Sequence, residues 1–149
     1  MFGWLFHFGL FLDMLRHLRY FIDPIWGWVA FIQPFGKSGS ILMVVGLLGL
    51  LGRRIFVDRV RYISSPSDHL MLVLLLAISS TGIAMSFYLG ADVISVKSFF
   101  IGLFTFDIQY IPPDPILISH LIMVAFLMII FPYSKLLHAP GLFLSLIHI

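Results

Sequence analysis

Apolar residues are gathered in long blocks along the chain, separated by shorter polar segments. The blocks lie at about residues 2–21, 35–52, 70–89 and 116–137. A helix needs roughly 20 mainly apolar residues to cross the hydrocarbon core of a bilayer. The pattern therefore predicts an antiparallel bundle of four transmembrane helices within residues 1–143.

Helix-breaking and capping residues mark the ends of these blocks. Asp23-Pro24 is expected to end the first helix, and Ser67-Asp68 to cap the third. The amphipathic segment SFFIGLFTFDIQY (98–110) predicts an interfacial helix outside the membrane core. Pro132 cannot donate a backbone hydrogen bond, so we expect it to bend the last helix near its end.

One loop carries a concentration of basic residues that sets the expected orientation. The loop follows the second block and contains Arg53, Arg54, Arg59 and Arg61. Loops rich in arginine and lysine stay in the cytoplasm, so four crossings place both chain ends there and make the first and last helices antiparallel. The loop is interpreted either as a topology signal alone or as a docking surface for a cytoplasmic partner.

The composition supports an all-α integral membrane protein with much of its surface in contact with lipid. Hydrophobic residues make up 60% of the chain and charged residues 11%, with a mean hydropathy of +1.07. A soluble domain of this size needs more polar surface. The absence of cysteine excludes disulfides, thiolate-held iron–sulfur clusters and covalently attached haem in this chain. A net charge of +2 is too small for a nucleic-acid-binding surface.

Histidines in the first and last blocks are the main candidates for function, because imidazoles inside membranes are scarce and usually functional. His7 and His17 lie ~15 Å apart along the first helix, and His120 and His138 lie ~27 Å apart along the last. The antiparallel arrangement brings His17 near the level of His120. It likewise brings His7 near the level of His138. Each pair could supply the two axial nitrogens of a b-type haem.

Two other functional classes are compatible with these histidines. In a proton or metal transporter they would form a relay, which carboxylates within the membrane would be expected to accompany. Only Asp13 approaches that description. In a non-redox membrane anchor the histidines would pack or make structural hydrogen bonds. His69, beside a helix start, is interpreted as an interfacial histidine and not as a ligand.

Three segments of the chain resemble a known family. LFHFG in the first block, LLGRRIFVDRVR after the second and HLIMVAFLMIIFPYSKLLH in the last are similar to the gamma subunit of respiratory nitrate reductase. Related proteins are the membrane cytochrome b subunits of heterodisulfide reductase and of sulfite-reduction-associated complexes. The resemblance extends from residue 1 to about 143. It implies a five-helix di-haem cytochrome b of a prokaryotic cytoplasmic membrane, of which this chain is interpreted as an N-terminally truncated member.

The resemblance also implies cofactors and partners. His17 and His120 would bind the iron of an outer haem b, and His7 and His138 that of an inner one. A quinol or quinone would exchange electrons at the outer haem. A cytoplasmic iron–sulfur or catalytic subunit would dock near the arginine loop and would carry the terminal reaction, for which this chain has no recognisable catalytic site.

Several other polar residues are secondary candidates. Arg16 and Arg19 flank His17 and are interpreted either as partners of haem propionates or a quinone oxygen, or as snorkelling side chains with Asp13 paired to Arg16. Lys37 is a candidate quinone contact because of its location.

The last segment of the chain carries two more candidates and a tail. Tyr133 and Lys135 lie near His138 in sequence and could reach a propionate of the inner haem. The closing SLIHI resembles translated adapter sequence, so residues 144–149 are interpreted as a non-native tail.

Overall fold

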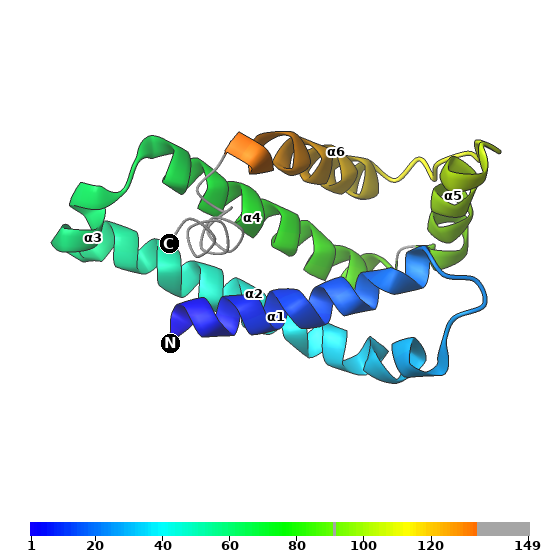
Figure 1. Ribbon diagram of the computed structural model, residues 1–149, viewed down its shortest axis with the longest axis horizontal. Coiled ribbons are helices and arrows are strands. Elements are labelled where there is room, and N and C mark those ends of the chain that lie inside the picture. The colour runs from blue at the N-terminus through cyan, green and yellow to red at the C-terminus, as the bar shows by residue number, and fades with distance from the viewer. Residues whose placement is uncertain (91, 134–149) are drawn as a thin grey trace, which may run out of the picture.

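The computed structural model describes residues 1–90 and 92–133, and every regular element in these ranges is a helix (Figure 1). The expected all-α fold is confirmed for this part of the chain. In order, the elements are α1 (Phe2–His17), η1 (Leu18–Tyr20), α2 (Gly27–Phe56), α3 (Asp58–Ile63), α4 (Pro66–Ala84), η2 (Met85–Leu89), α5 (Val93–Thr105), α6 (Pro115–Ile130) and η3 (Phe131–Tyr133).

Four long helices run along the length of the molecule, with shorter helices at both ends (Figure 1). α1 packs extensively on α2, α2 on α4, and α4 on α6. α1 and α6 run in opposite directions, as expected (Figure 1). They do not pack extensively on each other: α1 packs mainly on α2, and α6 packs mainly on α4. The short helix α3 lies at one end, and α5 lies crosswise at the other.

Glycines allow α1 and α2 to approach each other at the level of their backbones. A Cβ atom on Gly9 would lie 2.6 Å from the carbonyl oxygen of Gly39. A Cβ atom on Gly46 would lie 2.6 Å from the amide nitrogen of Phe6. Neither distance leaves room for a side chain, so this contact depends on small residues, as is common where helices pack inside membranes.

Two helical stretches in the described ranges are long and apolar enough to cross a bilayer. They are Gly27–Phe56, of 30 residues, and Pro66–Leu89, of 24 residues. α1 and α6 have 16 residues each, which is short for a crossing. The predicted count of four spans is therefore not confirmed by helix length, because the first and last crossings would need the 3-10 turns η1 and η3 as extensions.

The starts of α2 and α4 differ from the sequence-based expectation. α2 begins at Gly27 and continues through Pro34, so the helix that contains the predicted span 35–52 starts before that span. α4 begins at Pro66 with a capping box between Ser65 and Asp68, so the predicted Ser67 cap was wrong. Proline fits the first helical position, where no backbone donor is needed.

The later elements also differ in detail. α5 covers Val93–Thr105 in place of 98–110, because Asp92 caps it and Phe106, with φ of 60°, ends it. The α-helix of α6 ends at Ile130, so Pro132 lies in a 3-10 turn and does not bend a continuing α-helix. Lys135, His138 and the 144–149 tail lie outside the described residues.

Candidate functional site

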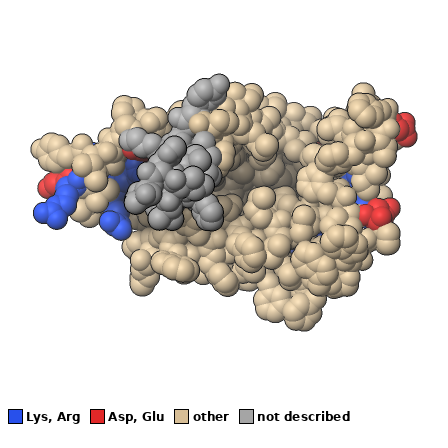
Figure 2. All heavy atoms as spheres, in the orientation of Figure 1, with Lys and Arg blue, Asp and Glu red and all other residues tan. Residues whose placement is uncertain are grey.

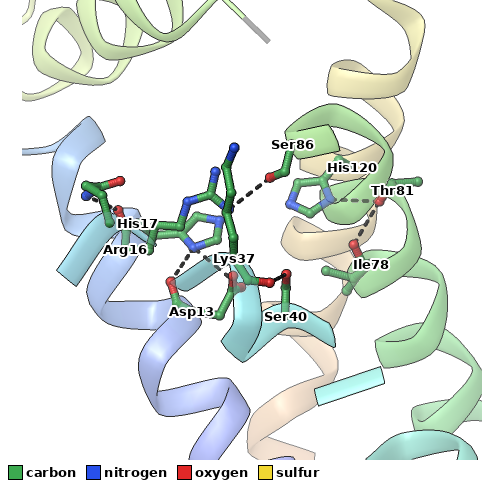
Figure 3. Close-up of polar contacts among 10 residues, drawn as sticks. Asp13, Arg16, His17, Lys37, Ser40, Ile78, Thr81, Ser86 and His120 are labelled. Atoms are coloured by element: carbon green, nitrogen blue, oxygen red, sulfur yellow. Dashed lines mark hydrogen bonds and ion pairs between the residues drawn. The ribbon is translucent and has the colours of Figure 1, made fainter. Parts of the chain in front are cut away.

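His17 and His120, the predicted outer pair, face a common region between α1, α4 and α6 (Figure 3). In Figure 3 the ring of His120 lies between Thr81 of α4 and His17 of α1. The structure thus brings together two imidazoles that are far apart in the sequence, although their helices do not pack extensively on each other.

The Nδ1 atom of His120 is held by α4. It lies 2.8 Å from Oγ1 of Thr81, and that hydroxyl also lies 2.9 Å from the carbonyl oxygen of Ile78. The hydroxyl has a single proton, and when it donates that proton to the Ile78 carbonyl, Oγ1 accepts the Nδ1 proton of His120. In this tautomer Nε2 of His120 carries the lone pair that a metal ion needs.

The Nδ1 atoms of His7 and His17 are bound within α1. His17 Nδ1 lies 2.7 Å from the Asp13 carbonyl oxygen, and His7 Nδ1 lies 2.7 Å from the Gly3 carbonyl oxygen. These bonds put the proton on Nδ1 and the lone pair on Nε2. His69 makes the same bond to Ser65, 3.1 Å away, so this pattern is a property of helical histidines and does not by itself identify a ligand.

Basic side chains surround the outer histidine pair. Arg16 donates from Nη1 to Oγ of Ser86, 2.9 Å away, and so links α1 to η2. The Lys37 ammonium lies 5.5 Å from the centre of the Phe87 ring. Asp13 was expected to pair with Arg16. Its ion-pair neighbour is instead His17, whose Nδ1 lies 3.6 Å from the Asp13 carboxylate.

Arg19 has a buried donor without a partner. Its Nη1 donates to Oε1 of Gln33, 3.0 Å away, and its guanidinium lies 5.0 Å from the centre of the Tyr20 ring. Its buried Nε has no hydrogen-bond partner among the residues that the structure describes. Buried donors are normally paired, so this nitrogen is available to an acceptor on a bound molecule.

His7 lies at the other end of α1, beside the arginine loop. With Arg53 it lines a hollow of about 500 Å³, and the other lining residues are Met1, Gly3, Trp4 and Leu50. Its predicted partner His138 falls outside the described residues, so this pairing stays a prediction. The side chain of Tyr133 is likewise outside what the structure describes.

The arginine loop is largely helical and not an irregular loop as predicted, because Arg53 and Arg54 lie in the last turn of α2 and Arg59 and Arg61 lie in α3. It forms a basic end of the molecule (Figure 2). Arg54 forms an ion pair with α4, since its Nη1 lies 3.4 Å from the Asp68 carboxylate. Arg53, Arg59 and Arg61 are exposed. Figure 2 also shows a recess on this face between α6 and α1.

The donor set fits a haem better than a bare metal ion. Within residues 1–90 and 92–133, no three histidine or aspartate side chains converge as a metal site. A haem iron takes four nitrogens from its porphyrin and needs only two from the protein. The pair His17 and His120, each with Nδ1 protonated, meets that need.

Sequence reasoning expected the hydroxyls of residues 79–81 to bond to their own helix or to a neighbour, but it assigned none of three polar residues of this region to the site. Thr81, Ser86 and Gln33 contact His120, Arg16 and Arg19, respectively. Their one signal in the sequence is that each is a polar residue beside or within an apolar block. Which neighbour each one meets depends on helix packing.

Comparison with known proteins gives consistent matches. A family model described as "Nitrate reductase gamma subunit" matches residues 2–147. A protein of Archaeoglobus fulgidus, named "Hdr-like menaquinol oxidoreductase cytochrome b-like subunit", is 39% identical over 161 residues, which cover 97% of this chain and 48% of that protein. A protein of the same name from Archaeoglobus profundus is 32% identical over 165 residues, with the same coverage. The chain thus spans about half the length of these relatives.

Proposed function

The chain belongs to the nitrate reductase gamma subunit family, and from this we propose that it is a membrane-embedded di-haem cytochrome b subunit. It carries electrons between the quinone pool and a cytoplasmic iron–sulfur or catalytic partner of an anaerobic respiratory oxidoreductase. The observation that supports the proposal is that His17 on α1 and His120 on α6 face a common region (Figure 3). The relatives' names favour menaquinol as the quinol.

The proposed topology has four crossings in a prokaryotic cytoplasmic membrane. α2 and α4 with η2 cross by their own length. α1 with η1 and α6 with η3 supply the other two, since each pair forms a nearly continuous helical stretch. The arginine loop at the α3 end is then cytoplasmic, and α5 lies at the outer surface.

At the outer end, His17 and His120 hold the iron of one haem b through their Nε2 atoms. The haem supplies reversible one-electron chemistry when bound. The Asp13 carbonyl and the Thr81 hydroxyl fix the two ligand tautomers. Arg16 and Arg19 provide cationic donors for propionates or a quinone oxygen, which agrees with the unpartnered Nε of Arg19.

Lys37 is the proposed contact to a quinone oxygen at this end. Its ammonium is on the exposed side of α2, next to Phe87, whose ring offers an apolar surface for a flat ligand. Asp13 is the one carboxylate beside the outer histidines in Figure 3. A quinol must lose protons when it is oxidised, so these two side chains are the candidate groups for binding and proton exchange.

At the inner end, His7 and His138 hold a second haem b. Arg53 lines the same hollow as His7 and is placed to neutralise propionate charge. Arg59 and Arg61 are exposed at the basic end and are the proposed contacts for the cytoplasmic partner. That partner carries the terminal reaction.

Visible spectroscopy of membranes containing the chain tests the proposal. Dithionite-reduced minus oxidised spectra should show b-type bands, with two haems per chain. His17→Ala and His120→Ala should each remove the same haem, and His138→Ala should remove the other. His69→Ala is the control and should retain both. Membranes without b-type bands would favour a histidine-relay transporter or a plain membrane anchor.

A further inference from the structure

Thr81 makes an interhelical bond to a proposed haem ligand. The residue lies in α4, and its Oγ1 is 2.8 Å from Nδ1 of His120 in α6 (Figure 3). The ring also lies near Gly82, where a Cβ atom would be in ordinary van der Waals contact, 3.6 Å from Cε1 of His120. The imidazole therefore lies against α4 and is joined to it by one hydrogen bond.

The direction of this hydrogen bond follows from the surroundings of the hydroxyl. Thr81 Oγ1 also lies 3.1 Å from the Ala77 carbonyl oxygen and 2.9 Å from that of Ile78. Donation to either carbonyl uses the hydroxyl proton within α4, and Oγ1 then accepts from His120. The bond then favours one tautomer and one ring orientation.

We propose that Thr81 is a positioning residue that orients His120 and lowers the reduction potential of the outer haem. The proposal rests on the proposed haem ligation. An acceptor on Nδ1–H increases the electron density at Nε2, which stabilises the ferric state of a bound iron. His17 receives the same support from a backbone carbonyl of its own helix. The hydrogen bond to Nδ1 of His120, in contrast, comes from a side chain, so a single substitution can remove it.

The two serines before Thr81 show what a purely structural hydroxyl does in this helix. Ser79 donates to the carbonyls of Leu75 and Leu76, and Ser80 donates to that of Leu76. Within the described part of the chain, neither hydroxyl makes a hydrogen bond to another helix. Ser80→Ala therefore removes a back-bonded hydroxyl and leaves His120 untouched, which makes it a matched control.

The test is a redox titration of the b-type bands in the full chain together with its partner subunits. Thr81→Val keeps the volume and removes the acceptor, so the midpoint potential of the outer haem should move to more positive values. Its haem affinity should fall by about 10- to 100-fold, the usual cost of removing a hydrogen bond to a metal ligand. Thr81→Ser should restore wild-type values, and Ser80→Ala should not change them.

The inner haem in the same sample shows whether each variant has folded. A Thr81→Val protein with both haems and an unchanged outer potential would overturn the role of Thr81 and leave the proposed function standing. If the valine variant loses both haems, Thr81→Ala takes its place, and wild-type behaviour of that variant would overturn the role. A wild-type protein without b-type bands would overturn the proposed function and this inference together.

Discussion

Gly46 of α2 and Phe6 of α1 are in contact through their backbones, with no space for a side chain on the glycine. A Cβ atom at Gly46 would lie 2.6 Å from the Phe6 amide nitrogen and 2.9 Å from its Cα. Phe6 is buried in the cluster that also contains Met43, Leu47 and Leu72. The position of α1, and with it that of His7 and His17, therefore depends on this glycine.

Gly46→Ala should destabilise the protein, because the added methyl group meets backbone atoms that cannot move aside independently. The expected loss is about 1–3 kcal/mol, typical of overpacking. Gly52→Ala is the matched control, since nothing lies within 4 Å of its Cβ position. It should be neutral or stabilising by up to ~1 kcal/mol. Thermal unfolding in detergent measures both, and equal midpoints would contradict the contact.

Lys37→Ala should weaken quinol use without removing haem. Loss of a charged hydrogen bond costs ~1.5–3 kcal/mol, so the KM for a menaquinol analogue should rise by about 10- to 100-fold. Lys97→Ala is the control, because that ammonium is paired with Asp23, 2.7 Å away, beyond the end of α1. Stopped-flow reduction of the haems by quinol measures the effect. A parallel loss in both variants would refute a specific role for Lys37.

Arg53→Leu should lower the potential of the haem assigned to His7, because a positive charge in the same hollow favours the reduced state of the iron. Arg59→Leu is the control, since Arg59 is exposed and does not line the hollow. A redox titration of the b-type bands distinguishes the two variants. If the two variants shift equally, the effect comes from the net charge of the loop and not from the hollow.

The start of α5 should be sensitive to acid. The Ser95 hydroxyl and the backbone amides of Ser95 and Ile94 donate to Asp92, and these bonds lower the pKa of its carboxyl group below 3.8. A lowered pKa in the folded state means that the carboxylate stabilises the helix above pH 3.8. This contribution is lost as the pH falls below that value.

Amide exchange measures this acid effect, after correction for the intrinsic exchange rate. Protection of the Val96 amide, which donates to the Asp92 carbonyl, should fall over that pH range. Asp92→Asn keeps a cap and should abolish the pH dependence. Unchanged acid sensitivity in that variant would assign the effect to another carboxyl group.

Sequence alone predicted the features that follow from hydrophobic pattern and helical rise. Antiparallel first and last helices predicted that His17 and His120 lie near the same level, and in the structure both side chains face a common region (Figure 3). The start of α4 was wrong because Pro66 is itself the first helical residue, with Ser65 as its cap. The contact between Thr81 and His120 could not be predicted, since three adjacent hydroxyls precede Gly82 and only the rotation of α4 against α6 selects one.

α2 is a single helix from Gly27 to Phe56, and it carries both Lys37 and Arg53. Sixteen residues at 1.5 Å each separate these side chains by ~24 Å along one axis. The distance between the proposed quinone contact Lys37 and Arg53 near the proposed partner end is therefore set by one continuous helix and not by loops. The length of α2 thus sets the separation of its two ends. Under the proposed function, a shorter or kinked α2 would change the distance over which each electron must tunnel.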